Sequence, residues 1–246
     1  MSRALVITSF GTSVAEARPA ITAVEEALRA AAPDYTCLRA FTSPTIRRIL
    51  AARGERVPSL QEALQDLQEM GTDQVVVQPT HLLPGYEFDK LRLEAERFTF
   101  PHLTVGRPLL SDEGDIALFA RRLAQDHPFK PEEAVVYMGH GTGHQANDIY
   151  GMIQAALEEI GRYDIHIGVL EGPPGLDGVL QRLERPRSVL LLPLLLAAGE
   201  HARTDMGGLW RTALKEAGHT VTCAFTGLGE RGWVQQLYCR RMLEVM

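Results

Sequence analysis

The sequence predicts an α/β protein of two similar lobes, in which each lobe is a parallel β-sheet flanked by helices. Short apolar runs alternate with amphipathic stretches along the chain, and continuous Val, Ile and Leu runs are typical of parallel strands buried on both faces. The ends of three strands in the first half also recur, in the same order, in the second half. The alternation predicts helical crossovers between neighbouring parallel strands.

The apolar runs predict eight strands of ordinary length. They cover residues 5–9, 36–41, 74–79, 103–106, 134–138, 164–170, 188–194 and 220–225. Three helix starts are readable between them. Ser43 precedes a proline, which favours a cap followed by proline at the first helical position. Ser59 and Glu62 have the spacing of a capping box, and Ser111 precedes two acidic residues that suit a first helical turn.

The second half of the chain repeats the strand ends of the first half. Two of the matches share an offset of 130 residues, and the third has an offset of 114, which indicates that sequence was lost between these elements. Three matches in order favour an internal duplication over the loose likeness of any two α/β units. The paired segments are residues 5–12 with 135–142, 36–41 with 166–171, and 75–85 with 189–199.

The duplication predicts an N-terminal lobe of residues 1–127 and a C-terminal lobe of residues 128–246. The expected joint is the segment 126–131, which contains two prolines. The chain is long enough for each lobe to bury a core of its own. The oligomeric state cannot be read from the sequence, and a homo-oligomer remains open.

Composition excludes several classes of partner. A formal net charge of −6 gives no electrostatic support for general binding to nucleic acid. The longest strongly apolar run, residues 189–198, is too short to span a bilayer, so we expect no membrane partner. The three cysteines form no C-x-x-C pair, which fits a reduced compartment and predicts a cytoplasmic protein. No organic cofactor is predicted.

The strand tips predict where ligands bind, because ligands bind beyond the carboxyl ends of strands in open parallel sheets. The tips carry Phe10, Phe41 and Glu87 in the first lobe, and His140, Glu171 and His201 in the second. The two imidazoles and the carboxylate of the second set suit Co, Ni, Fe or Zn, and three protein ligands leave coordination positions open for exchange. We therefore expect the C-terminal lobe to carry a metal-binding and catalytic site.

The three candidate metal ligands, His140, Glu171 and His201, each have a structural explanation when taken alone. His140 lies between two glycines of a tight turn, Glu171 suits a helix cap, and His201 lies near a helix start. Their joint position at equivalent strand tips favours the site. Two further histidines are weaker candidates. His81 also follows a strand tip, and His144 follows His140 by four residues, the spacing of a helical pair. A zinc hydrolase is an alternative for this ligand set, although the sequence has no H-E-x-x-H helix.

Several stretches resemble one known family over nearly the whole chain. They include VITSFGTS, RAFTS, MGHG, GVLEG, PLLLAAGEHA and DM, at residues 6–13, 39–43, 138–141, 168–172, 193–202 and 205–206. These stretches resemble the anaerobic sirohydrochlorin cobaltochelatases of cobalamin biosynthesis, which belong to the class II chelatases together with protoporphyrin ferrochelatase.

The resemblance implies a chelatase-like fold that inserts Co²⁺, as substrate metal, into sirohydrochlorin bound between the lobes. It implies that His140 and His201 bind the metal, with Glu171 as the site glutamate. Glu87 matches an acidic position that faces the family's cleft, and Phe10 and Phe41 are expected to form an apolar wall for the ring. An iron or nickel chelatase remains an alternative, as does a carrier that binds metal or tetrapyrrole without turnover.

Overall fold

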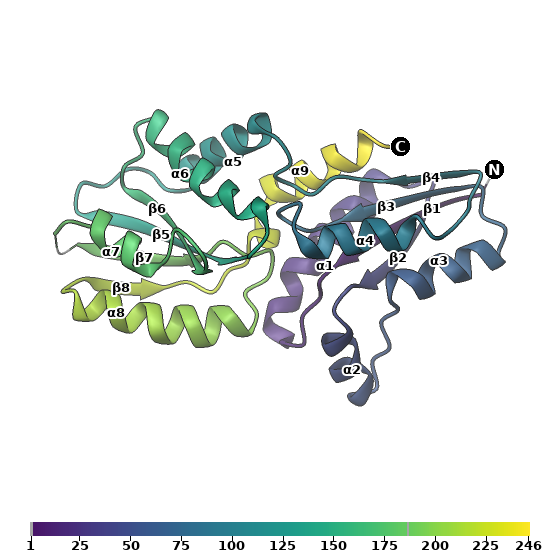
Figure 1. Cartoon of the computed structure of the whole chain (residues 1–246), viewed down its shortest axis with the longest axis horizontal. Coiled ribbons are helices and arrows are strands. Elements are labelled where there is room, and N and C mark those ends of the chain that lie inside the picture. The colour runs from purple at the N-terminus through teal and green to yellow at the C-terminus, as the bar shows by residue number, and fades with distance from the viewer. Residues whose placement is uncertain (1, 186) are drawn as a thin grey trace. The chain divides into compact units, whose positions relative to one another are not determined.

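A computed structural model describes residues 2–185 and 187–246 (Figure 1). The chain divides into two compact units. Unit 1 combines Met1–Leu109 with Gly229–Met246, and unit 2 comprises Leu110–Leu228. Each unit contains one sheet of four parallel strands.

The sheet of unit 1 contains β1 (Arg3–Ser9), β2 (Thr36–Phe41), β3 (Gln74–Pro79) and β4 (His102–Val105). Their order across the sheet is β2-β1-β3-β4. The strands β1 and β3 are almost entirely buried, which explains why their sequences are continuous apolar runs rather than alternating ones.

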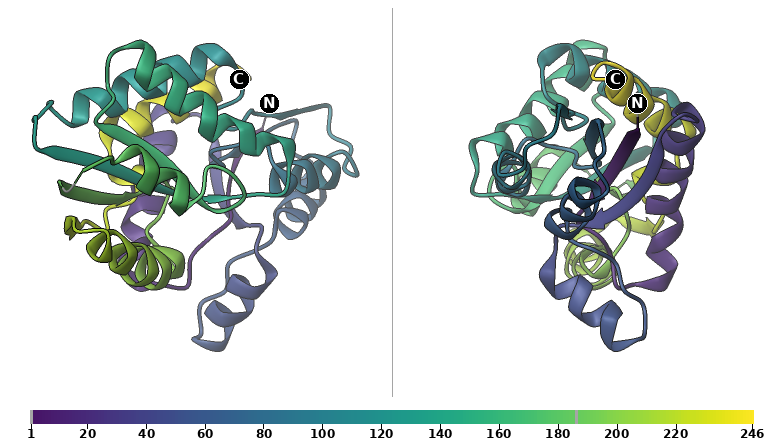
Figure 2. Two further views of the ribbon diagram at one scale, coloured as in Figure 1. Left: turned by 60° about the vertical axis from the view of Figure 1, so that its left-hand side comes forward. Right: turned by 90° about the vertical axis from the view of Figure 1, so that its right-hand side faces the viewer.

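Helices cover both faces of this sheet. The side chains of α3 and α4 share one core with Val6 and Val77, while α1 and α9 pack against each other and contact β1 and β3 (Figure 2). Successive residues of a strand point to opposite faces, so each pair of helices has its own set of strand side chains. The helices are η1 (Ala15–Ala17), α1 (Arg18–Ala31), α2 (Pro44–Ala52), α3 (Leu60–Glu69), α4 (Tyr86–Ala95) and α9 (Gly232–Leu243), and η4 (Leu228–Glu230) begins at the last residue of unit 2 and ends in unit 1.

The sheet of unit 2 contains β5 (Glu133–Gly141), β6 (Ile165–Glu171), β7 (Ser188–Pro193) and β8 (Thr220–Cys223). Their order is β6-β5-β7-β8. This order repeats that of unit 1 when the strands are numbered from the start of each unit, as an internal duplication requires.

Helices cover both faces of the second sheet as well. Trp210 and Leu214 share a core with Val136 and Met138 on one face, while α5 and α6 pack together on the other. On that second face the Tyr137 hydroxyl lies 2.8 Å from His127 Nε2. The helices are α5 (Glu113–Asp126), η2 (Gln145–Asn147), α6 (Asp148–Glu159), α7 (Leu176–Arg182), the π-helix η3 (Ala202–Trp210) and α8 (Arg211–Glu216).

All eight predicted strands are present. The register of the paired strands shows which residues of the two units are equivalent. Leu5 pairs with Val76 and Val135 pairs with Leu190, which agrees with the offsets of 130 and 114. The match of residues 36–41 with 166–171 is wrong by two residues. Ser9 pairs with Phe41 whereas Gly139 pairs with Val169, so Phe41 lies at the level of Val169 rather than of Glu171. A shift of two keeps every side chain on the same face, so the apolar pattern does not reveal it.

The two units differ in their bounds from the predicted lobes of residues 1–127 and 128–246. Helix α5 belongs to unit 2 because it packs against α6. Helix α9 belongs to unit 1 because it packs against α1 and β3. The sequence shows where an amphipathic helix lies along the chain, but the helix joins whichever sheet buries its apolar face.

Two of the three predicted helix starts are confirmed. The Ser43 hydroxyl accepts a hydrogen bond from the Ile46 amide, and Ser59 forms a reciprocal capping box with Glu62. The third start is wrong by one residue, because Asp112 rather than Ser111 is the cap of α5. The Asp112 carboxylate accepts from the Asp115 amide, and a carboxylate also interacts favourably with the helix dipole.

Candidate metal centre

Two predicted ligands, His140 and His201, lie side by side in unit 2. The centroids of their imidazole rings are 4.7 Å apart, and the ring planes are at 88°. His140 is partly buried near the end of β5, and His201 is the exposed residue directly before η3. Residues distant in sequence therefore come together at the carboxyl end of the second sheet, as the strand-tip argument predicts.

The hydrogen bonds of the two rings determine which nitrogen remains for a ligand. His140 Nδ1 lies 3.0 Å from the Gly141 carbonyl oxygen, and His201 Nδ1 lies 2.8 Å from Asp205 Oδ2. Because a carbonyl and a carboxylate only accept, both Nδ1 atoms carry the proton. In a neutral imidazole the lone pair then belongs to Nε2, which is the form that binds a metal ion.

Glu171 is the last residue of β6 and pairs with Gly141, the neighbour of His140. Its side chain is exposed. Among the described residues, no three His, Cys, Asp or Glu side chains are close enough together to hold a metal ion. The structure thus places the two histidines as a pair and the backbone of Glu171 beside Gly141, but it does not bring the Glu171 carboxylate together with the two rings.

The end of β5 approaches its neighbours closely at two glycines. Gly141 has a φ of +78°, which L side chains rarely adopt, and its backbone touches that of Glu171. A Cβ atom on Gly139 would lie 2.4 Å from the Tyr150 ring, so this glycine lets Tyr150 pack beneath the strand. Burial raises the pKa of the Tyr150 hydroxyl, which keeps it protonated.

Asn147 connects the two loops that follow β5 and β6. Its Oδ1 accepts from the Thr142 amide at 3.0 Å, and its Nδ2 donates to the Pro173 carbonyl oxygen at 2.6 Å. One side chain therefore fixes the loops next to His140 and Glu171. Sequence reasoning missed this residue, and no local pattern indicates it, because its two partners are separated from it by a turn and a whole β-α segment.

Asp205 is a second residue that sequence reasoning missed. Here a signal was available, because Asp205 follows His201 by four residues at a predicted helix start, a spacing that places two side chains on one helical face. The motif Asp205-Met206 contributed to the family resemblance without being assigned a role.

The two other histidines considered from the sequence have different surroundings. His81 belongs to unit 1, and both of its ring nitrogens are buried without a hydrogen-bond partner among the described residues. Burial lowers its pKa to about 4, so it is neutral at physiological pH. His144 Nδ1 accepts a hydrogen bond from the Ala146 amide, which gives it a structural role as the cap of η2.

The predicted ring contacts Phe10, Phe41 and Glu87 all belong to unit 1. Phe10 follows β1 and is 50% exposed. Phe41 is buried, with its ring against Gly11. Glu87 lies in the first turn of α4 and forms an ion pair of 2.7 Å with Lys90.

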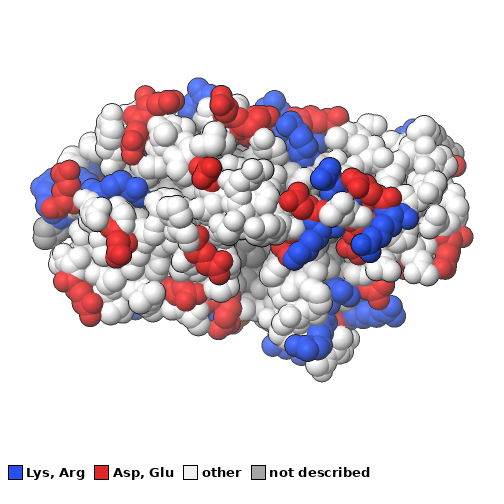
Figure 3. All heavy atoms as spheres, in the orientation of Figure 1, with Lys and Arg blue, Asp and Glu red and all other residues white. Residues whose placement is uncertain are grey.

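Basic side chains gather over α2 and α4 on the face shown in Figure 3. Several of them already have acidic partners in the chain. Arg47 lies 3.3 Å from Glu62, and Arg92 lies 3.8 Å from Glu96. Arg48 is exposed on α2. These cations suit a ligand with several carboxylates, since arginine binds carboxylates with bidentate geometry.

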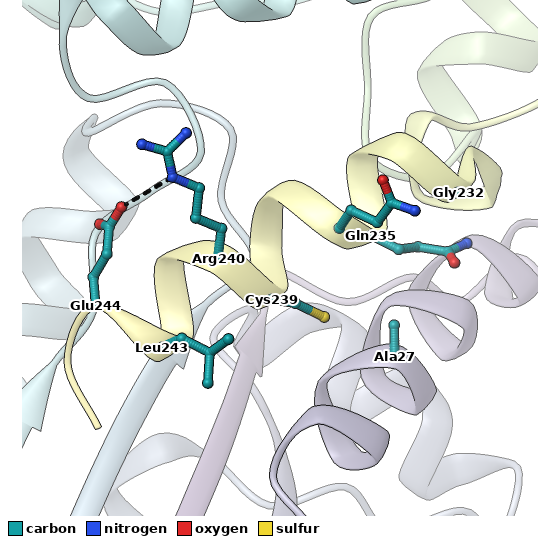
Figure 4. Close-up of a pocket in the computed structure, with 8 residues that line it drawn as sticks. Ala27, Gly232, Gln235, Cys239, Arg240, Leu243 and Glu244 are labelled. Carbon is teal, nitrogen blue, oxygen red and sulfur yellow. Dashed lines mark ion pairs between the residues drawn. The ribbon is translucent and has the colours of Figure 1, made fainter.

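A groove between α1 and α9 lies elsewhere in unit 1 (Figure 4). Its wall includes Ala27 from α1 and Cys239 from α9, with an ion pair of 3.6 Å between Arg240 and Glu244 at one end. None of the predicted site residues lines it, so this groove and the histidine pair are separate features.

Comparison with known proteins identifies the family. The sequence matches the family described as Cobalt chelatase (CbiK) over residues 3–246. The chain belongs to this family. The predicted recognition is therefore confirmed, and so is the prediction that the protein is a chelatase, an enzyme that acts on cobalt.

Two relatives that match nearly the whole chain support this family assignment. The sirohydrochlorin cobaltochelatase of Salmonella typhimurium is 34% identical over 257 residues, covering 100% of this chain and 97% of that protein. The sirohydrochlorin cobaltochelatase CbiKC of Nitratidesulfovibrio vulgaris is 33% identical over 240 residues, covering 93% of this chain and 85% of the relative.

The fold of the chelatase is similar to that of SirB from Bacillus subtilis, solved with Fe³⁺. The TM-score is 0.70 with 18% identity, covering 100% of this chain and 96% of SirB. The predicted chelatase-like fold of two parallel sheets is confirmed by this likeness and by the strand order. In the part of the chain that the structure describes, no helix has the length and hydropathy needed to cross a bilayer.

Proposed function

We propose that this chelatase inserts Co²⁺ into sirohydrochlorin in anaerobic cobalamin biosynthesis. The observation that carries the proposal is the pair of His140 and His201, with rings 4.7 Å apart and the lone pair of each neutral ring on Nε2. Two relatives that align over most of their length are named for this activity. Nitrogen donors suit Co²⁺, Ni²⁺ and Fe²⁺ alike, so the choice of cobalt rests on the family.

In this proposal His140 and His201 hold Co²⁺ by neutral imidazole, and Glu171 is the third member of the site. The exposed Glu171 side chain is free to rotate toward a metal held by the two rings, or to accept a proton from a pyrrole nitrogen. Metal insertion must displace two pyrrole protons, so the site needs a base as well as ligands. A site of three protein ligands leaves coordination positions open for the tetrapyrrole nitrogens.

The tetrapyrrole is proposed to contact residues of unit 1. Phe10 offers an exposed apolar ring, Glu87 an acidic side chain, and Phe41 supports the backbone at Gly11 from below. Arginines of α2 are suited to the carboxylates of the substrate. Binding energy from these contacts can hold the macrocycle bent, which exposes the nitrogen lone pairs to the metal.

We infer a cytoplasmic location because Cys37, Cys223 and Cys239 are all free thiols, as expected in a reducing compartment. The substrates in this proposal are a metal ion and a tetrapyrrole, and the chemistry requires no organic cofactor.

The proposed activity is tested by mixing catalytic amounts of the chelatase with sirohydrochlorin and excess Co²⁺ and following the absorption spectrum. We expect many equivalents of cobalt-sirohydrochlorin per protein, at a rate well above that of the protein-free mixture. Parallel reactions with Ni²⁺ and Fe²⁺ under the same anaerobic conditions identify the preferred metal. Conversion that stops at one equivalent would instead identify a carrier, and a faster reaction with nickel or iron would overturn the assignment of cobalt.

A further inference from the structure

His201 has a hydrogen-bond partner of a kind that His140 lacks. Its Nδ1 lies 2.8 Å from a carboxylate oxygen of Asp205, whereas His140 Nδ1 donates to the neutral carbonyl of Gly141. A metal-binding imidazole that donates its other N–H to a carboxylate has a fixed tautomer and ring orientation and is a stronger base. The two histidines are therefore chemically unequal before any metal arrives.

Packing of the neighbouring residue limits the position of Asp205. The Thr204 hydroxyl has one proton and faces two acceptors, the Glu200 carbonyl oxygen at 3.0 Å and Asp205 Oδ2 at 3.3 Å, so it contributes at most a shared hydrogen bond to the carboxylate. On the other side of the helix Met206 is fully buried in the core of unit 2. The backbone that carries Asp205 is thus anchored by packing one residue away.

The helix itself is of an uncommon kind. Residues Ala202–Trp210 form a π-helix, and π-helical segments are rare and are found frequently at functional sites. Ala202 and Trp210 at its two ends are buried in the same core as Met206. Asp205 follows His201 by about one turn, so the helix places the carboxylate against the imidazole.

The exposure of the pair indicates that its role is not to stabilise the fold. The side chains of His201 and Asp205 are 53% and 35% exposed, and an interaction this accessible to water contributes little to stability. An exposed hydrogen bond can still orient an imidazole ring, because the orientation depends on the direction of that bond and not on its contribution to the stability of the fold.

We propose that Asp205 is a positioning residue for cobalt insertion. Its carboxylate holds His201 in the Nδ1–H tautomer with the lone pair on Nε2, and makes His201 the stronger cobalt ligand of the pair. This inference rests on the proposed metal-binding role of His140 and His201.

The test compares Asp205→Ala and Asp205→Asn with the wild-type protein and with Asp177→Asn. Asp177 lies exposed in the first turn of α7 in the same unit, so its variant makes the same charge change away from the pair. Two quantities are measured without tetrapyrrole. Long-range ¹H–¹⁵N NMR of the metal-free protein reports the His201 tautomer, and a calorimetric titration with Co²⁺ reports affinity.

We expect wild type and Asp177→Asn to show Nδ1–H at His201 and equal Co²⁺ affinity. Asp205→Ala should move the proton of His201 toward Nε2 and weaken Co²⁺ binding by about 10–100-fold, while the circular dichroism spectrum stays unchanged. Asp205→Asn retains an acceptor without the charge, so its affinity should fall between the two. This partial rescue is not expected of a residue that only supports the fold.

Two different failures can be told apart. If wild type binds Co²⁺ through His140 and His201 and Asp205→Ala binds it equally tightly with the same tautomer, the inference is overturned while the proposed site stands. If wild type itself binds no Co²⁺, the proposed metal site is overturned, and the role of Asp205 with it.

Discussion

A Cβ atom on Gly141 would lie 1.9 Å from the carbonyl oxygen of Glu171, because β5 and β6 pair at this level. The backbone of the residue next to His140 therefore touches that of the predicted site glutamate. No side chain of any size fits between them. The approach of the two strand tips depends on a residue that has no Cβ atom.

Gly141→Ala should destabilise the chelatase by about 2–5 kcal/mol, since it combines an unfavourable φ with a backbone collision. Gly161→Ala is the matched control, because Gly161 has nearly the same φ of +77° but nothing within 4 Å of its Cβ position. That control should lose only about 1–2 kcal/mol. Urea unfolding measures both variants, and equal losses would show that the collision is relieved without cost.

Asn147→Ala should lower the free energy of unfolding by about 1–3 kcal/mol, because it leaves the Thr142 amide and the Pro173 carbonyl without their partner. It should also slow cobalt insertion, since the loops beside His140 and Glu171 are no longer tied together. Gln145→Ala, an exposed change in the same segment, is the control and should match wild type. Wild-type stability and rate in Asn147→Ala would contradict this role.

His166 predicts how stability depends on pH. Burial, assisted by the charges of Arg182 and Arg187 and opposed by Asp164, lowers its pKa to about 4. The unfolded chain binds this proton near pH 6.5 and the folded chain only near pH 4. The contribution of His166 is therefore fully present above pH 6.5 and is lost as the pH falls to about 4, by roughly 3 kcal/mol in total.

Urea unfolding at pH 7 and at pH 4.5 tests this linkage. His166→Gln should show a smaller fall in stability between the two pH values than wild type does. Exposed His102 provides the control variant, His102→Gln, which should fall as wild type does. An unchanged fall in His166→Gln would mean that other groups account for the acid sensitivity.

The parts of the fold that the sequence predicts well are those with a local cause. Strands such as Gln74–Pro79 are continuous apolar runs, and the capping box of Ser59 and Glu62 is a spacing rule. The lobe bounds were less predictable, because α9 returns to unit 1 through packing against α1. The equivalence of residues between the two units was also hard to predict, because the two-residue shift of Phe41 relative to Glu171 preserves the apolar pattern of the strands.

The candidate site shows the same division. That His140 and His201 meet follows from their position at neighbouring strand ends, which topology dictates. The hydrogen bond from Asn147 to Pro173 depends on two loop conformations, for which the sequence has no rule. The direction of the Glu171 side chain at an exposed strand end is likewise not encoded by its neighbours in sequence.

His201→Ala should lower the rate of cobalt insertion by about 100-fold or more, while the fold and most of the affinity for sirohydrochlorin are kept. The side chain is 53% exposed, so its loss should cost far less than the roughly 2–5 kcal/mol of a large buried side chain. Fluorescence quenching measures ring binding and absorbance measures insertion on the same preparation. His102→Ala should match wild type in both. Insertion at the wild-type rate by folded His201→Ala would make this residue a bystander.

Anomalous diffraction from a crystal soaked with Co²⁺ shows whether one metal ion binds between His140 and His201. We expect a cobalt peak bonded to the Nε2 atoms of both histidines, with Glu171 turned toward it. A single strong peak at His81 or His144, with none at the histidine pair, would mean that these two residues are not the metal ligands.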